Sequence, residues 1–545
     1  MNGGREPVTL GAVMIVKNEE LSLPGILSDI QGVVDEICIV DTGSTDRTVA
    51  LAEAHGAHVH HFPWCDDFSA ARNRSIEHAG SDYLIWLDAD DRIDDTDRTA
   101  LSALKKRLRK ERDRAYTLRV LGCSSDTPDT LFHQTRIVPN RPGVRFEGRV
   151  HEQILPSLRR LGIRVEQTGI TIRHTGYHDE QARITKARRN LDILRSEISD
   201  GMETANAHFF MAMACITLKE YEECLEHIHR ARALRNDEDW LHFSFTVSAE
   251  CLLRLGRPAD AQAEIKSGLG LFPSSALLTF SLGRSYMEAG MYGEAATAFR
   301  KASTLPAIED SYPSPPTLGP LALVLCGNAL EKAGKTAEAI ETYRLALASG
   351  ADPKAAHQAL GMALLKRGDV QASLGHLREA KALSARVDAP LWVSLARIHE
   401  YMRDEPSAHD LYTEVLRDDP SHGEALVGLL ATSIGMNDVD SFFHALERLM
   451  TRTSTAFPDH EIESLEECAE LCLAVGLRLR EMGENNLAMR MAESAVRLDP
   501  SCASAFLLQA DVYRDRGETA RMAACLEEAL KHGADRREVL ERLQP

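Results

Sequence analysis

The chain has 545 residues, of which 44% are hydrophobic and 27% are charged, with a formal net charge of -19. This length exceeds what one hydrophobic core supports, so several units, or one domain joined to an array, are expected. The composition excludes disordered and fibrous classes, and the acidic balance argues against nucleic acid as a partner because phosphate groups would be repelled.

Short apolar runs alternate with helical segments over roughly the first 177 residues. Strands are predicted at 12–16, 36–40, 58–62 and 83–87, with helices at 19–30, 47–55 and 69–78. This βαβαβαβ order predicts a largely parallel sheet that helices cover on both faces. Ligands are then expected at the carboxyl ends of the strands.

An acidic triplet follows the last of these strands. Asp88, Asp90 and Asp91 come directly after the apolar run that ends at Leu87. Carboxylates in this position project from the carboxyl edge of a sheet, where they can hold a hard divalent cation that neutralises a diphosphate. Taken alone, such a triplet is often only an exposed turn or a helix cap, so its meaning depends on the neighbouring motifs.

Three further motifs accompany the triplet in a fixed order. A strand runs into a polar turn at residues 13–20, a second strand delivers Asp41 to the same edge, and Arg72 lies on a helix that begins there. At these points the chain resembles family 2 glycosyltransferases of the GT-A fold, in particular the bacterial subgroup of lipopolysaccharide-core glucosyltransferases and bacteriocin S-glycosyltransferases. The resemblance covers roughly residues 9–177. It implies an α/β GT-A domain, Rossmann-like with a mostly parallel sheet.

The resemblance also implies a nucleotide-sugar site. Asp41 would hydrogen-bond the base or ribose, and Arg72 would lie near the base and the diphosphate. The turn after the first strand would complete these contacts through Val16, Asn18 and Glu19. Helix capping by Asp41 and a surface ion pair at Arg72 are the alternatives.

A metal site is implied beside it. Asp88 would contact the ribose or support the metal, and Asp90 would bind Mn²⁺ or Mg²⁺ directly. Such a cation acts as a Lewis acid that stabilises the departing nucleoside diphosphate. Residues 170–177 are predicted to form a last strand that ends in His-Thr-Gly. His174 could return to the metal or the diphosphate, as downstream histidines do in several GT-A enzymes, and a structural role is its alternative.

An inverting transferase also needs a base that takes the proton of the acceptor. The Phe-Glu-Gly-Arg-Val-His-Glu stretch that ends at Glu152 resembles a motif that follows the acidic triplet in this subgroup. Glu152 is the predicted base, and His151 would contribute to base or leaving-group contacts. Asp91 is the competing base because it adjoins the metal site. Simple pairing of Glu152 with Arg149 or Arg145 is the alternative.

Beyond a helix predicted near residues 180–199 the pattern changes to helices throughout, and a turn glycine recurs, mainly every 34 residues. The recurring turn positions are Gly256, Gly290, Gly334, Gly368, Gly483 and Gly517. Lys219, Arg403 and Asn437 occupy the equivalent turn in further units. A helix-turn-helix period of this length is the mark of tetratricopeptide repeats, and about eight or nine of them fit between residues 204 and 540.

Such repeats stack into a superhelix with a concave surface. The predicted organisation is a catalytic domain over residues 1–178, a connecting helix over 179–203 and an all-α tetratricopeptide-repeat superhelix over 204–545. Repeat arrays of this kind commonly bind peptides or proteins. Self-association of the chain, which would produce a homo-oligomer, is the alternative.

No export or membrane signal is visible in the sequence. The N-terminus lacks the long apolar core of a signal peptide, and no window reaches the ~20 apolar residues of a membrane span. The 11 cysteines are scattered and form no CxxC pair, as expected of reduced thiols. We therefore expect a cytoplasmic protein without a membrane span.

These patterns together predict an inverting, metal-dependent glycosyltransferase. It would move a hexose from a nucleoside diphosphate sugar to a protein or peptide acceptor recruited by the repeats, and the resemblance favours a UDP-sugar as donor. The alternatives are a lipid-linked or lipopolysaccharide-core acceptor, and a non-catalytic repeat scaffold whose first domain only binds nucleotide-sugars. The intact set of Asp88, Asp90 and Glu152 argues against the scaffold.

Overall fold

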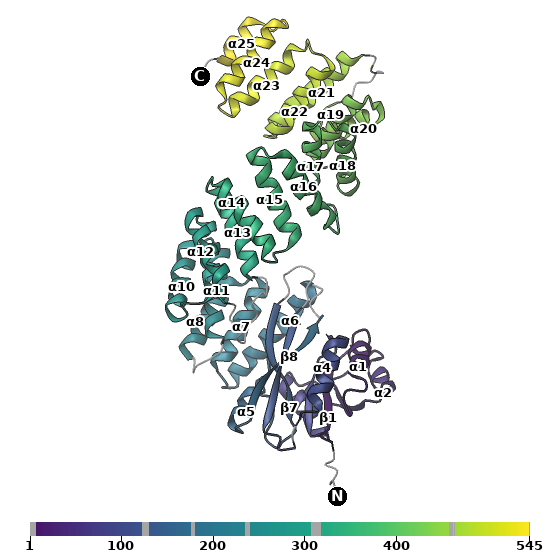
Figure 1. Cartoon of the computed structure of the whole chain (residues 1–545), viewed down its shortest axis with the longest axis vertical. Coiled ribbons are helices and arrows are strands. Elements are labelled where there is room, and N and C mark those ends of the chain that lie inside the picture. Colours follow the sequence, from purple (N-terminus) through teal and green to yellow (C-terminus); the bar gives the residue numbers. More distant parts are fainter. Residues whose placement is uncertain are drawn as a thin grey trace. The chain divides into compact units, whose positions relative to one another are not determined.

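The computed structural model describes residues 7–543 apart from 109, 123–129, 176–179, 235–239, 307–317, 457–461 and 463. The chain forms two compact units, Met1–Lys335 and Thr336–Pro545 (Figure 1). The first unit contains a β-sheet followed by helices, whereas the second is helical in all its described elements. No helix within the described ranges is long and apolar enough to cross a membrane.

The described part of the first unit holds an eight-stranded sheet in the order β3-β2-β1-β4-β7-β6-β8-β5. Its strands are β1 (Leu10–Val16), β2 (Glu36–Asp41), β3 (His58–His61), β4 (Tyr83–Trp86), β5 (Asp91–Arg92), β6 (Arg114–Gly122), β7 (Thr130–Pro139) and β8 (Arg164–His174). The first four strands pair in parallel, as predicted.

The second half of the sheet differs from the prediction. β7 is antiparallel to both β4 and β6, and β8 is parallel to β6 but antiparallel to β5. The sheet is therefore mixed, with four parallel and three antiparallel strand pairs among those described. Only seven residues separate the end of β6 at Gly122 from the start of β7 at Thr130, whereas a parallel pair would require a crossover connection of about a dozen residues or more.

Helices cover both faces of the sheet, which confirms that prediction. They are α1 (Leu23–Ile30), α2 (Thr48–Ala54), α3 (Phe68–His78), α4 (Asp95–Lys105) and α5 (Leu155–Arg160). The even-numbered residues of β1 share an apolar core with α1 and α4, while Val13 of the same strand belongs to a second core with α3 and α5. Side chains of a strand alternate between its faces, so a strand that is buried on both faces feeds two cores.

Helix α1 begins at Leu23, four residues later than the sequence predicts. Asn18 adopts a left-handed conformation with φ of 55°, and the backbone N–H of Glu19 donates to Thr48 Oγ1 at 2.7 Å. These two residues form a turn that is bound to a neighbouring loop. The helix can therefore start only after that turn.

The predicted connecting helix is α6 (Glu180–Ser199). It is followed in the first unit by α7 (Ala205–Leu218), α8 (Tyr221–Leu234), α9 (Leu241–Arg254), α10 (Pro258–Leu271), α11 (Ala276–Glu288), α12 (Tyr292–Thr304) and α13 (Leu318–Lys332). The second unit contains α14 (Thr336–Ala348), α15 (Pro353–Arg367), α16 (Val370–Ala382), α17 (Ala389–Tyr401), α18 (Glu405–Asp418), α19 (Gly423–Met436), α20 (Val439–Thr453), α21 (Leu465–Glu481), α22 (Asn485–Leu498), α23 (Ala503–Asp515), α24 (Thr519–Lys531) and α25 (Arg536–Leu543).

The turns between paired helices lie at the positions that the repeat spacing predicts. The predicted glycines have φ values between 70° and 90°, a left-handed conformation that ends a helix without steric cost. Lys219, Arg403 and Asn437 take the same conformation, with φ of 65°, 61° and 55°. The turn prediction is confirmed at all nine positions.

Candidate active site

The carboxyl ends of three parallel strands meet at one edge of the sheet. Val16 pairs with Asp41 across β1 and β2, and Val13 pairs with Trp86 across β1 and β4. The residues that follow these strands therefore emerge side by side. This register brings Val16, Asp41 and the start of the acidic triplet at Asp88 to the same edge.

The turn after β1 is bound to the loop after β2. Asn18 donates its backbone N–H to Ser44 Oγ at 2.9 Å, and its side-chain oxygen accepts the N–H of Thr45 at 2.7 Å. Half-buried Glu19 follows it, and burial together with the nearby Asp90 carboxylate raises its pKa. Asn18 thus holds the turn after β1 against the loop after β2, and Glu19 adds a carboxyl group to this edge of the site.

Asp41 is 3% exposed, and its carboxylate accepts the backbone N–H groups of Gly43 and Ser44 at 3.2 and 3.1 Å. His61 Nδ1 lies 3.3 Å from the same carboxylate. Burial alone would raise the pKa of Asp41, but these hydrogen bonds outweigh it and lower the pKa overall. Asp41 is therefore an ionised acceptor that shapes its own loop, whereas α2 begins after Arg47 without a side-chain cap.

Arg72 joins two of the predicted functional carboxylates. Its guanidinium donates to Asp88 Oδ1 at 2.7 Å and to Glu152 Oε1, and it lies 4.5 Å from the centre of the Trp86 ring. Burial would lower the pKa of Arg72, but the two carboxylates raise it overall. Because Arg72 is 7% exposed, this is a buried ion pair rather than a surface one. Glu152 therefore pairs with Arg72, whereas Arg145 and Arg149 pair with other carboxylates.

Arg136, in β7, is a second buried cation, and sequence reasoning missed it. It is 2% exposed, and its Nη1 lies 3.5 Å from Asp88 Oδ2 and 3.2 Å from Asp91 Oδ2. Burial would raise the pKa of Asp88, but Arg72 and Arg136 together lower it. The sequence signal that could have identified Arg136 is a charged residue within an apolar strand, because a buried charge requires a partner of opposite charge.

Four of the predicted residues form a compact cluster beyond β4. Asp88, Asp90, Asp91 and His174 each offer one ligand atom, and these atoms lie within 4.8 Å of one another. The pairing of β5 with β8 sets His174 Nδ1 3.0 Å from Asp91 and 3.3 Å from Asp90. Burial would lower the pKa of His174, but these carboxylates raise it overall. Carboxylate oxygens with one imidazole nitrogen suit a divalent cation, so the residues fit the predicted metal.

The two candidate bases differ in accessibility. Asp91 is 0% exposed, and its carboxylate accepts the N–H of Asp88 at 2.8 Å while contacting Arg136 and His174. The side chain of Glu152 is 12% exposed. Asp91 therefore holds neighbouring groups in place, whereas the Glu152 side chain is partly exposed.

The loop that carries Glu152 rests on the first repeat helix. Val150 belongs to the same apolar core as α7 and α8. His151, with φ of 52°, stacks on Phe210 of α7 at a centroid distance of 4.1 Å. The contact of His151 with Phe210 thus fixes one side of the loop.

Helix α6 also contributes a charge to the site. Lys186 lies close enough to Glu19 and Asp90 to counteract the rise in pKa that burial causes at both. Nothing in the sequence indicated that Lys186 lies near the site, because it belongs to a helix that was predicted only to connect the two domains.

Residues 12–177 match the model of glycosyl transferase family 2. They form a family 2 glycosyl transferase domain. The tetratricopeptide repeat model matches residues 249–307 and 326–386. The chain therefore joins this glycosyl transferase domain to tetratricopeptide repeats.

Two similar proteins each carry one of these two elements in their names. A TPR repeat-containing protein of Synechococcus elongatus is 36% identical over 200 residues, which cover 35% of this chain and 48% of that protein. The SPbeta prophage-derived glycosyltransferase SunS of Bacillus subtilis is 24% identical over 254 residues, which cover 46% of this chain and 59% of that protein. The chain thus spans about half the length of these relatives.

One solved structure of a repeat protein also matches part of the chain. The C-terminal part of a TPR repeat-containing protein from Cytophaga hutchinsonii matches with a TM-score of 0.34 and 12% identity, over 55% of this chain and 100% of that chain.

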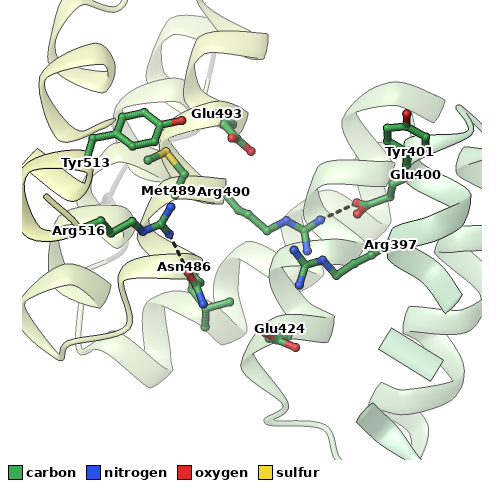
Figure 2. A pocket seen from close by; sticks show the side chains of 11 residues that line it. Arg397, Glu400, Tyr401, Glu424, Asn486, Met489, Arg490, Glu493, Tyr513 and Arg516 are labelled. Atoms are coloured by element: carbon green, nitrogen blue, oxygen red, sulfur yellow. Dashed lines mark hydrogen bonds and ion pairs between the residues drawn. The ribbon is translucent and has the colours of Figure 1, made fainter. Parts of the chain in front are cut away.

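The repeats of the second unit enclose a pocket of about 480 Å³ among α17, α19, α22 and α23 (Figure 2). Its charged lining consists of Arg397, Arg490, Arg516, Glu400, Glu424 and Glu493. Arg490 points across the pocket to Glu400 and pairs with it at 2.5 Å (Figure 2). At its rim, Arg397 is exposed and Tyr401 is 76% exposed. The pocket thus offers both charges and an aromatic ring to a ligand.

Proposed function

We propose that this protein transfers a hexose from a nucleoside diphosphate sugar to an acceptor, with inversion at the anomeric carbon. The observation that carries the proposal is the convergence of three aspartates, Arg72 and Glu152 at one sheet edge, in a domain that matches glycosyl transferase family 2. The name of the Bacillus relative, a glycosyltransferase, supports the same class of reaction.

The donor would lie along the carboxyl edge of β1, β2 and β4. Asp41 would accept hydrogen bonds from the base or ribose, and Arg72 would hold Asp88 ionised beside the diphosphate. The residues that would hold Mn²⁺ or Mg²⁺ are Asp90 and His174, with Asp88 in support, and the cation would supply Lewis-acid stabilisation of the leaving diphosphate. A UDP-sugar remains the favoured donor by resemblance.

Glu152 is the proposed base. As the nucleophilic atom of the acceptor bonds to the anomeric carbon, its proton passes to a carboxylate oxygen of Glu152. The bond between the anomeric carbon and the diphosphate oxygen breaks, and its electron pair leaves with the nucleoside diphosphate. The partial exposure of the Glu152 side chain supports this role over Asp91, which is fully buried.

A protein or peptide is the proposed acceptor. Tetratricopeptide arrays offer extended surfaces that suit chains rather than single sugars. The pocket of the second unit supports this, because its paired charges and exposed Tyr401 can hydrogen-bond and pack against an extended polar segment.

The direct test is metal-dependent thermal stabilisation by a panel of nucleotide-sugars. Wild type would be compared with Asp90→Ala and with Asp95→Ala, a matched control whose side chain is fully exposed. Binding to the folded state adds about 2.7 kcal/mol at one hundred times the Kd. One donor should stabilise wild type and Asp95→Ala only with Mn²⁺ or Mg²⁺, and should not stabilise Asp90→Ala. A donor effect that is equal in all three proteins, or absent from all three, would overturn the proposal.

A further inference from the structure

A second cluster of metal-ligating side chains lies where α7 and α8 form the first repeat. Cys215 of α7 and Glu223 and His227 of α8 each offer one ligand atom, and these atoms lie within 4.8 Å of one another. Glu223 and His227 are four residues apart, so they lie one turn apart on the same face of α8. Cys215 reaches this face from the other helix of the hairpin.

The cluster is closed on one side and open on the other. Cys215 is 0% exposed, whereas the side chains of His227 and Glu223 are 16% and 36% exposed. A cation could therefore enter past Glu223 and reach a buried sulfur.

Hydrogen bonds determine which nitrogens of a neighbouring histidine carry hydrogen. His208 Nε2 lies 2.9 Å from Glu203 Oε1, which also accepts from Arg230 Nε at 2.8 Å. A carboxylate paired with an arginine only accepts, so His208 carries its hydrogen on Nε2. His208 Nδ1 lies 3.0 Å from His227 Nδ1. In the tautomer of His208 that carries hydrogen on Nε2 alone, His227 is the donor in that contact.

A neutral His227 with its hydrogen on Nδ1 has a lone pair on Nε2. Within the part of the chain that the structure describes, this buried atom has no hydrogen-bond partner. It lies 3.6 Å from Glu223 Oε1. A lone pair and a carboxylate that face each other repel unless a cation lies between them. A metal-bound histidine also donates its other N–H to an acceptor, as His227 does to His208.

Glu223 has one further partner. Arg195 of α6, which is 50% exposed, donates to Glu223 Oε1 at 2.8 Å. This ion pair uses one carboxylate oxygen and leaves Oε2 for another cation. A proton on His227 Nε2 would also relieve the repulsion between this nitrogen and the Glu223 carboxylate. The sulfur of Cys215 lies beside both groups, however, and sulfur is a ligand for metal ions, which favours metal binding over protonation.

We propose that Cys215, Glu223 and His227 bind a divalent cation of borderline softness, such as Zn²⁺, with water completing its coordination. A thiolate sulfur and an imidazole nitrogen favour Zn²⁺ over the Mg²⁺ or Mn²⁺ proposed for the catalytic domain. Binding forms a metal–sulfur bond and releases the thiol proton of Cys215 to solvent. The ion would fasten α7 to α8 in the repeat that supports the Glu152 loop.

The test is a titration of the metal-free, full-length protein with Co²⁺, because cobalt–thiolate bonds absorb in the near ultraviolet. Wild type should gain this absorption at one equivalent per chain and lose it when Zn²⁺ is added. Cys215→Ser should remove the absorption, and His227→Gln should weaken Co²⁺ binding by about 10-fold or more. Glu223→Gln, at a partly exposed position, is a third variant that should fold normally and should also bind Co²⁺ more weakly.

Three controls separate this site from others. Cys472→Ser changes a fully buried thiol in the second unit. His376→Gln changes the matched histidine pair, in which the Nδ1 atoms of His357 and His376 lie 2.9 Å apart, and no metal-ligating cluster among the described residues includes either one. Asp90→Ala removes the oxygen-based site. All three should keep the cobalt absorption. A folded wild type without the absorption, or a Cys215→Ser protein that retains it, would overturn the proposal.

Discussion

The ring of Trp86 lies between the charged groups of the site and the apolar core of the sheet. Its Nε1–H donates to the carbonyl oxygen of Thr135 at 2.8 Å, and the guanidinium groups of Arg72 and Arg136 lie 4.5 and 3.7 Å from its centre. Cations over an aromatic face are stabilised most where water is excluded. The two arginines are thereby held at Asp88, which keeps this carboxylate ionised.

Arg136→Met is expected to lower the free energy of unfolding by about 3–5 kcal/mol, because it removes the arginine that pairs with the buried carboxylate of Asp91. Urea denaturation at neutral pH measures the loss. The control is Arg145→Met, whose side chain is 65% exposed in its pair with Glu147 and should cost about 0.5 kcal/mol or less. Equal losses in the two variants would contradict the assignment of Arg136.

Glu152→Gln is expected to lower kcat by about 10²- to 10⁴-fold with little change in the KM for the donor. The amide oxygen can still accept from Arg72, so the loop should keep its position. Steady-state kinetics provides the measurement.

Asp91→Asn is the contrasting variant. Because the Asp91 carboxylate contacts Arg136 and His174, this change should lower stability as well as activity. If Glu152→Gln keeps its kcat while a folded Asp91→Asn protein loses activity, Asp91 is the base instead.

At the scale of helices, strands and turns, the sequence predicts the features that depend on a short stretch of neighbouring residues. The turn glycines were found because a left-handed residue is needed at a fixed spacing, and the same spacing located Lys219 and Arg403 without a glycine. Asp41, Asp88 and Asp90 were singled out because each comes after a strand that the sequence predicts. β7 was missed because Gln134 and Arg136 interrupt its apolar pattern, and the partner of Arg136 is Asp91, which lies in a distant segment.

Asp82 is an acid-sensitive link between β1 and β4. Its carboxylate accepts from the N–H and Oγ1 of Thr9 at 3.1 and 3.2 Å and pairs with Arg112. Burial would raise the pKa of Asp82, but these contacts lower it overall. A lowered pKa contributes stability that is present above the unfolded value of about 3.9 and is lost as the pH falls through the folded value.

Asp82→Asn should therefore be less stable than wild type at pH 7, and the difference should shrink as the pH falls below about 4. Chemical denaturation at a series of pH values tests this. Asp95→Asn, at a fully exposed carboxylate, should show no such trend. A stability difference between Asp82→Asn and wild type that stays constant with pH would contradict the role of Asp82.

The contact between His151 and Phe210 links the first repeat to the loop that carries the proposed base. Phe210→Ala should lower kcat with little change in donor binding, because the loop that carries Glu152 loses its support. The half-buried ring should cost about 1–3 kcal/mol of stability. The control is Phe243→Ala, a half-buried ring packed on the same core.

Kinetics on the folded fraction separates the two effects. Phe243→Ala should lose similar stability without a fall in kcat, and Phe210→Tyr should restore activity. If both alanine variants lose kcat equally, the support that Phe210 gives to the loop has no specific catalytic effect.

At the scale of the whole molecule, the first unit is not a catalytic domain with a detachable array. Val150 from the Glu152 loop is buried in the core of the first repeats, and Trp64 and Phe68 pack against the same core. A chain that ends near Gly201 would expose this apolar surface to water. Recruitment of an acceptor is therefore better tested by point changes in the second unit than by truncation.

The pocket of the second unit provides those changes. The double variant Arg397→Ala, Tyr401→Ala removes two exposed side chains from its rim and should leave the fold intact. If the pocket recruits the acceptor, the KM for a protein acceptor should rise by about 10-fold or more, which corresponds to about 1.4 kcal/mol of lost binding. Donor hydrolysis without acceptor should not change, because the proposed catalytic residues belong to the first unit.

Transfer of labelled sugar from the donor into an acceptor protein measures both quantities. The matched control is Arg344→Ala, which removes a 50% exposed arginine of α14 that pairs with Glu341 on its own helix. It should leave both rates as in wild type, since one exposed pair contributes little to stability. An unchanged acceptor KM in the double variant would exclude this pocket as the docking site and leave the other repeat surfaces to be tested in the same way.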